Sequence, residues 1–194
     1  MITQWPNKKP NIPPFAHRFA SGYNDRLFDK YVKPDMGVIV DVGTWLGWSA
    51  REFIKRTETG LVYTIDNWTG VPAAHTFSMP SSVLDNLRDV FIVNSWEYRD
   101  RIRMIESDTI EGLSLVWGLE PKVDLVYIDA SHDYYDVYDD VRKALSCWPD
   151  AQVMGDDYHP IDWPGVVQAV KDYAHEYGFE IDEIGTCWAL RRKQ

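Results

Sequence analysis

The chain has 194 residues, with 30 acidic side chains against 20 Lys and Arg, and its formal net charge at pH 7 is −10. This length suits one domain with a core of its own. The acidic balance argues against a nucleic-acid partner, because a phosphate backbone needs a basic face. The sequence begins without the apolar core of a signal peptide and holds no run of membrane-spanning length, so we expect a cytoplasmic protein with no membrane partner. Cys147 and Cys187 fit no metal spacing and are expected to be free thiols, although a disulfide is open to them.

Strand-like and helix-like segments alternate along most of the chain. Residues 1–20 are proline-rich and predict an extended arm, and 21–32 have helical spacing, so residues 1–33 form an expected N-terminal arm and helix. The sequence then predicts, in order, a strand at Val38–Asp41, a helix at Ser49–Arg56, strands at Leu61–Asp66 and Arg101–Ile105, a helix from Asp108 to Val116, a strand at Val123–Asp129, a helix at Tyr134–Cys147, a strand at Ala151–Gly155, a helix at Gly165–Tyr177, and strands at Glu180–Ile184 and Thr186–Arg191. This alternation is typical of βαβ units. We therefore expect an α/β, Rossmann-like doubly wound fold over residues 34–194, with a mainly parallel seven-stranded sheet and an antiparallel C-terminal strand.

Residues 67–98 interrupt the alternation, because the segment is too long for a simple connection between a strand and a helix. Part of it, residues 82–92, has helical spacing. It follows directly after the second predicted strand, at the sheet edge where ligands bind in open α/β sheets. We therefore expect it to act as a lid.

Two glycines lie between the first predicted strand and the helix after it. Gly43 and Gly47 would let the backbone approach a ligand closely. Their spacing matches neither the dinucleotide-binding Gly-x-Gly-x-x-Gly pattern nor a P-loop, which favours a nucleotide-like ligand without a pyrophosphate. Asp66 ends the next strand, where a carboxylate can accept both hydroxyls of a ribose. Asp41 would either order the loop or meet an amino group of the ligand.

Two apolar runs end abruptly in acidic residues. Asp129 ends one predicted strand, and Asp156 and Asp157 follow the next. Because the carboxyl ends of parallel strands meet at one edge of a sheet, we expect these side chains to lie together. Three such carboxylates cannot all stay ionised and unpaired, so the sequence predicts a divalent cation with oxygen ligands, such as Mg²⁺.

Taken together, these motifs resemble those of class I S-adenosylmethionine-dependent O-methyltransferases. The likeness is greatest to the metal-dependent catechol-type enzymes and to the macrocin O-methyltransferase and cephalosporin-hydroxylase-like group, and it covers residues 38–158. The motifs that carry it are Asp41-x-Gly43-x-x-x-Gly47-x-Ser49, Asp66, Ser107-Asp108, the IDASHD stretch that begins at Ile128, and the GDDY stretch that begins at Gly155.

The resemblance implies a role for each motif. The loop glycines would border the methionine part of S-adenosylmethionine, Asp66 would bind its ribose, and Ser107-Asp108 would contact its adenine. The implied cofactor-binding residues are Asp41, Gly43, Gly47, Ser49, Asp66, Ser107, Asp108 and Asp129. The implied metal ligands are Asp129, Asp156 and Asp157. His132 matches the general base of macrocin-type enzymes, where catechol-type enzymes have lysine.

A neutral imidazole at His132 would supply a base without adding negative charge, although a metal-ligand or helix-start role is also open. The expected function is Mg²⁺-assisted methyl transfer to a hydroxyl of a small molecule, either a sugar or an aromatic diol, and a homo-oligomer is compatible with it. One alternative is a metal-dependent hydrolase or hydroxylase, although an Fe(II) oxygenase would be expected to have two histidines and one carboxylate. The other is a noncatalytic ligand-binding protein.

Overall fold

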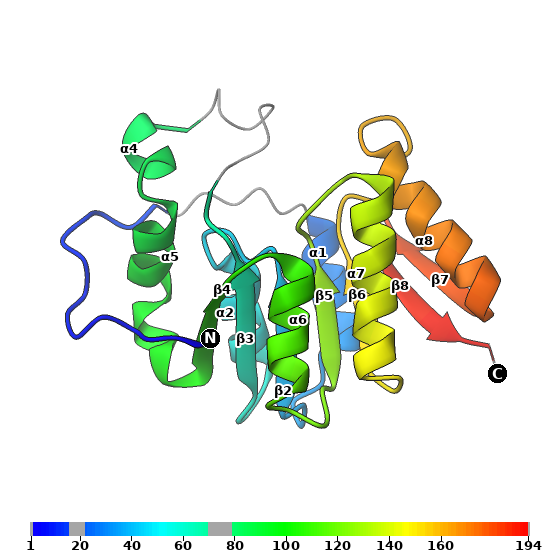
Figure 1. Cartoon of the computed structure of the whole chain (residues 1–194), viewed down its shortest axis with the longest axis horizontal. Helices are drawn as coiled ribbons and strands as arrows, with labels where there is room; N and C mark the ends of the chain where they lie inside the picture. The colour runs from blue at the N-terminus through cyan, green and yellow to red at the C-terminus, as the bar shows by residue number, and fades with distance from the viewer. Residues whose placement is uncertain (1, 16–21, 70–78, 194) are drawn as a thin grey trace.

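A computed structural model gives one eight-stranded sheet with helices on both faces (Figure 1). It describes residues 2–15, 22–69 and 79–193. The strands are β1 (Ile2–Thr3), β2 (Val38–Val42), β3 (Leu61–Asp66), β4 (Ile102–Glu106), β5 (Leu125–Ile128), β6 (Gln152–Gly155), β7 (Phe179–Ile184) and β8 (Cys187–Arg192). They lie in the order β1-β4-β3-β2-β5-β6-β8-β7. Strands β2 to β6 are parallel, whereas β1 and β8 run antiparallel to their neighbours, which confirms the α/β, mainly parallel fold.

The helices alternate with the central strands as the sequence predicts. They are α1 (Gly22–Tyr31), α2 (Trp48–Arg56), α4 (Ser81–Leu84), α5 (Leu87–Ser95), α6 (Thr109–Trp117), α7 (Tyr134–Cys147) and α8 (Pro164–Tyr177), with a 3₁₀ helix at Trp96–Arg101. Helices α6, α7 and α8 cover one face of the sheet, and α1 and α2 cover the other (Figure 1). Each face has its own apolar cluster, because successive residues of a strand point to opposite faces.

Two local predictions were wrong. The proline-rich arm is not wholly extended coil, since β1 pairs Ile2 with Ile105 and adds an eighth strand to the sheet. This pairing covers an edge of β4 that would otherwise expose unpaired backbone groups. The helical stretch expected at 82–92 is divided into α4 and α5, because Asn86 has φ −138° and ψ 34°, outside the helical region.

The expected lid at residues 67–98 stays a prediction, and residues 70–78 of it lie outside the described ranges. The part that forms α5 is a core helix. Leu87, Val90 and Phe91 are buried in the cluster that α5 shares with α1 and α2.

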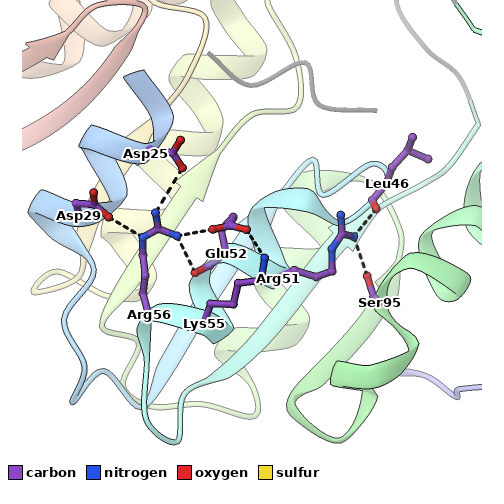
Figure 2. A network of polar contacts seen from close by, with 8 residues as sticks. All are labelled: Asp25, Asp29, Leu46, Arg51, Glu52, Lys55, Arg56 and Ser95. Atoms are coloured by element: carbon purple, nitrogen blue, oxygen red, sulfur yellow. Dashed lines mark hydrogen bonds and ion pairs between the residues drawn. The ribbon is translucent and has the colours of Figure 1, made fainter. Parts of the chain in front are cut away.

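Helix α1 is part of the same packed unit as the sheet, although the expected division between residues 1–33 and 34–194 stays a prediction. Leu27 and Phe28 are fully buried in the core. On the outside of the helix, Arg56 of α2 bonds Asp29 at 2.9 Å and Asp25 at 3.4 Å (Figure 2). The N-terminal helix is therefore fixed against α2 from both its apolar and its polar side.

Candidate functional site

The loop between β2 and α2 is built for close backbone approach. Gly43 has φ 83° and Gly47 has φ 76°, a region that favours glycine. A Cβ on Gly43 would lie 2.2 Å from the carbonyl oxygen of Asp129, and one on Gly47 would lie 2.5 Å from Ser95 Oγ. A side chain at either position would therefore collide with the next strand or with α5.

The same loop is anchored through the carbonyl of Leu46. This oxygen accepts hydrogen bonds from Arg51 Nη1 at 3.0 Å, as Figure 2 shows, and from Asn94 Nδ2 at 3.2 Å. Because Arg51 belongs to α2 and Asn94 to α5, the loop is held from two helices. Its shape is therefore fixed by the protein itself.

Asp66, at the carboxyl end of β3, is held by the backbone of two tryptophans. Its Oδ2 accepts from Trp45 N at 2.7 Å and its Oδ1 from Trp68 N at 2.8 Å. Both tryptophans have positive φ, 46° and 48°, and Trp68 Nε1 donates to the carbonyl of Trp45 at 2.8 Å. Burial raises the pKa of Asp66, although these N–H groups oppose the rise. Each carboxylate oxygen can accept a second hydrogen bond, so the group is oriented and can still bind a hydroxyl pair.

Asp41 lies on the α2 side of β2. It is fully buried, and its Oδ2 accepts from Ser49 Oγ at 2.7 Å. Burial raises the pKa of Asp41 to about 6, against the opposing effect of the Ser49 and Thr44 hydrogen bonds, and the charge of Asp66 adds to the rise. This contact connects β2 to the first turn of α2 and favours the loop-ordering interpretation of Asp41.

Ser107 and Asp108 lie beside Asp66 at the start of α6. Ser107 N donates to the carbonyl of Asp66 at 3.2 Å. Asp108 caps the helix, since its Oδ1 accepts from Glu111 N at 2.8 Å, as the sequence predicted. The structure thus brings the loop glycines and the predicted ribose and adenine positions to one edge of the sheet.

Asp129 and Asp156 are neighbours at this same edge, because the β5–β6 register pairs Ile128 with Gly155. Burial, followed by the charges of Asp156 and Asp157, raises the pKa of Asp129 well above its ordinary value. Crowded carboxylate oxygens are the donors that a hard divalent cation prefers, so the chemistry of this set suits such an ion.

Asp157 points elsewhere. Its φ is 60°, and its Oδ2 lies 2.6 Å from His132 Nε2. Within residues 2–15, 22–69 and 79–193, no three His, Cys, Asp or Glu side chains are arranged to hold a metal ion. The structure therefore places Asp129 next to Asp156 and pairs Asp157 with His132, and the metal role of these aspartates stays a prediction.

His132 is held on two sides. Besides its contact with Asp157, its ring stacks on Trp163, with the ring centroids 3.8 Å apart and the planes 19° from parallel. Trp163 lies in the loop that follows β6, just before α8. The imidazole is therefore oriented by a carboxylate at its edge and by an indole on its face.

Sequence reasoning missed three contributors to this edge. They are the backbone N–H groups of Trp45 and Trp68, the indole of Trp163, and Asn24, which donates to Asp156 Oδ2 at 2.6 Å. A signal existed for Asn24, because it lies one turn before Leu27 and Phe28 on the apolar stripe of a helix, where a polar residue needs a partner. No sequence signal reveals the others, since they depend on backbone geometry and on long-range packing.

Comparisons with known proteins agree with this geometry. The sequence model of a family described as a methyltransferase domain matches residues 40–158. No curated protein sequence matches the chain. Among solved structures, the chain is similar to the calicheamicin methyltransferase CalS11, with 17% identity over 88% of this chain and 77% of that chain and a TM-score of 0.63.

Two further solved structures share the fold. An O-methyltransferase from Bacillus cereus in complex with SAH has 16% identity over 91% of this chain and 84% of that one, with a TM-score of 0.64. The O-methyltransferase NovP has 15% identity over 89% of this chain and 76% of that one, with a TM-score of 0.58. At these identities the likeness establishes the fold and leaves the acceptor open.

Proposed function

Because this chain belongs to the methyltransferase-domain family, we propose that it transfers a methyl group from S-adenosylmethionine to a hydroxyl of a small molecule. The observation that carries the proposal is the single sheet edge at which the oriented Asp66 carboxylate and the His132–Asp157 pair both lie. One part of this edge suits a nucleoside, and the other suits proton removal from an acceptor.

S-adenosylmethionine, when bound, supplies a methyl group made electrophilic by its sulfonium. The loop at Gly43 and Gly47 would border the methionine part, and Asp66 would accept the ribose hydroxyls. Ser107 and Asp108 would contact the adenine, because they begin α6 directly beside Asp66. Asp41 would keep the loop in place through Ser49.

We assign the general base to His132. It would take the proton of the acceptor hydroxyl while the oxygen forms its bond to the methyl carbon and the electrons of the carbon–sulfur bond go to sulfur. Asp157 and Trp163 would hold the ring, so that its orientation is set before the acceptor arrives. Asp129, Asp156 and Asp157 are the residues that would hold a divalent cation such as Mg²⁺, whose chemistry would be to bind the acceptor oxygens and make the hydroxyl more acidic.

For the acceptor we propose a sugar or an aromatic diol. Support for a sugar comes from CalS11, whose apo structure is described as a TDP-rhamnose 3'-O-methyltransferase and has 16% identity to this chain with a TM-score of 0.62. Adjacent hydroxyls are what both acceptor classes share. A pair of oxygens of this kind would suit the edge between Asp129 and His132.

The direct test uses methyl-labelled S-adenosylmethionine with two sets of acceptors, nucleotide-activated sugars and catechols, each with Mg²⁺ and with excess chelator. We expect label in one acceptor set, and we expect the chelator to lower the rate. Failure of S-adenosylmethionine to bind in calorimetry would refute the methyltransferase. Cofactor binding without transfer to any hydroxyl would instead indicate a noncatalytic binding protein, and cofactor-independent turnover a hydrolase or hydroxylase.

We also propose that the protein acts in the cytoplasm. Both cysteines are free, with Cys187 buried and Cys147 partly buried, and free thiols suit a reducing compartment. Among the described helices, none has the length and apolar character needed to cross a membrane. Whether the chain forms a homo-oligomer is decided by its mass in solution.

A further inference from the structure

Helix α1 delivers a buried polar side chain to the acidic edge of the sheet. Asn24 is only 1% exposed, and its amide nitrogen donates to Asp156 Oδ2 at 2.6 Å and to Tyr127 Oη at 3.0 Å. These partners lie more than a hundred positions away along the chain, on β6 and β5. Burying an amide is costly unless it is hydrogen-bonded, so its place here depends on these contacts.

The contacts of Asp156 divide between its two oxygens. Oδ1 accepts from Asp157 N at 2.8 Å, and Thr186 Oγ1 and Cys187 Sγ lie 3.3 and 3.4 Å away. Oδ2 accepts from Asn24. A carboxylate held at both oxygens cannot turn about its last side-chain bond, whereas one held at a single oxygen can. Asn24 therefore fixes the orientation of the Asp156 carboxylate.

Tyr127 extends the effect to Asp129. Its hydroxyl accepts from Asn24 and lies 3.5 Å from Asp129 Oδ2, toward which it donates. Its ring packs edge-on against Phe28 of α1, with centroids 5.2 Å apart. One amide on α1 is thus connected with the terminal carboxylates of two neighbouring strands.

The position of Asn24 is itself secured. Arg56 of α2 bonds Asp25 and Asp29, the residues that flank Asn24 on the outer side of α1 (Figure 2), and Lys30 pairs with Asp182 of β7. An amide also adds donors without adding charge. The acidic pair is therefore oriented and keeps its negative charge for a cationic ligand.

We propose that Asn24 is a positioning residue of the active site, which orients Asp156 directly and Asp129 through Tyr127, so that α1 belongs to the catalytic unit. The inference rests on the proposed methyltransferase function. It predicts that losing the amide donors disturbs the acidic edge and lowers turnover, and that cofactor binding near Asp66 is left unchanged.

The test compares Asn24→Asp and Asn24→Ser with the control Asp29→Asn. Asn24→Asp keeps the size but places an acceptor against Asp156, Asn24→Ser keeps one donor on a shorter side chain, and Asp29 lies on the same helix with a side chain that is 69% exposed. We expect kcat to fall roughly 10- to 100-fold in Asn24→Asp and less in Asn24→Ser. KM for S-adenosylmethionine should stay at the wild-type value, and Asp29→Asn should behave as wild type.

A second measurement is independent of catalysis. Hydrogen exchange of the Asp157 amide, which donates to Asp156 Oδ1, is followed by NMR, and we expect it to be faster in both Asn24 variants and unchanged in Asp29→Asn. If wild type transfers no methyl group, the proposed function fails, and the exchange rates still decide the role of Asn24. Should Asn24→Asp not fold, Asn24→Ser decides both measurements. Wild-type kcat, or an unchanged Asp157 exchange rate in a folded Asn24 variant, would overturn the proposal.

Discussion

At the scale of single residues, the proposed ribose acceptor is oriented by strained backbone. Trp45 and Trp68 both adopt positive φ, which costs energy for side chains of this size, and both point their N–H groups at Asp66. The pairing explains why the strain is tolerated, because the carboxylate repays it with two charge-assisted hydrogen bonds. A change at Asp66 should therefore affect the cofactor and the loop together.

We predict that Asp66→Ala weakens S-adenosylmethionine binding by about 1.5–3 kcal/mol, because the ribose loses a charged acceptor. The melting temperature should fall as well, since the N–H groups of Trp45 and Trp68 lose their partner. Calorimetry and thermal unfolding measure the two effects. Asp66→Asn, which retains one acceptor oxygen, should lie between wild type and Asp66→Ala, and unchanged affinity in Asp66→Ala would remove this residue from the site.

His132 makes a prediction about rate alone. If it is the general base, His132→Ala should lower kcat by roughly 10²–10⁴ and leave S-adenosylmethionine affinity unchanged. His159 is a suitable control, because it is a partly exposed histidine that pairs with Asp162 at 3.0 Å in the same region. His159→Ala should retain most activity, and equal losses in the two variants would argue against a specific base at His132.

At the scale of elements, the joint between α6 and α7 contains a buried acid. Asp140 of α7 is 1% exposed, and its Oδ1 accepts from Thr109 Oγ1, at the start of α6, at 2.5 Å. Burial raises the pKa of Asp140 to about 7, with the charges of Asp136, Asp139 and Asp108 adding to the rise and the Thr109 hydrogen bond opposing it. The element that carries Ser107-Asp108 is thus connected to α7 through a group that titrates near neutrality.

The sign of the resulting pH dependence follows from the raised pKa. The folded state binds this proton more tightly than the unfolded chain, whose aspartate pKa is about 3.9, so the stabilisation is complete below that value and is lost as the pH rises through about 7. Asp140→Asn should therefore gain about 1–3 kcal/mol of unfolding free energy over wild type at pH 8, and less at pH 5. Urea titrations at the two pH values measure this, with the half-exposed Asp139 changed to Asn as the control. A gain that does not grow with pH would contradict the assignment.

At the scale of the whole molecule, any ligand of the folded state raises the stability of the entire chain. Mg²⁺ at about 100 times its dissociation constant should add about 2.7 kcal/mol, which is roughly 5–10 °C in melting temperature for a chain of this size. Asp156→Asn should abolish this increase, because a hard cation prefers charged oxygen ligands.

The control for the metal prediction is Asp162→Asn, an exposed acid in the loop after β6, which should respond to Mg²⁺ as wild type does. S-adenosylmethionine alone should stabilise all three proteins. If Mg²⁺ raises the melting temperature of Asp156→Asn as much as that of wild type, the ion does not bind at the acidic edge.

The sequence by itself determined the order of elements, because apolar runs and helical spacing are local properties. Leu61–Asp66 and Tyr134–Cys147 lie where these patterns predict them, and the edge at which the motifs gather follows from the parallel alternation. Only the tertiary structure decided which side chains meet there. Asp157 turns to His132 because its φ is 60°, and Asn24 reaches Asp156 because α1 folds back onto the sheet. Neither a backbone torsion nor a contact across more than a hundred residues is written in a local pattern, since both are set by how the packed elements meet.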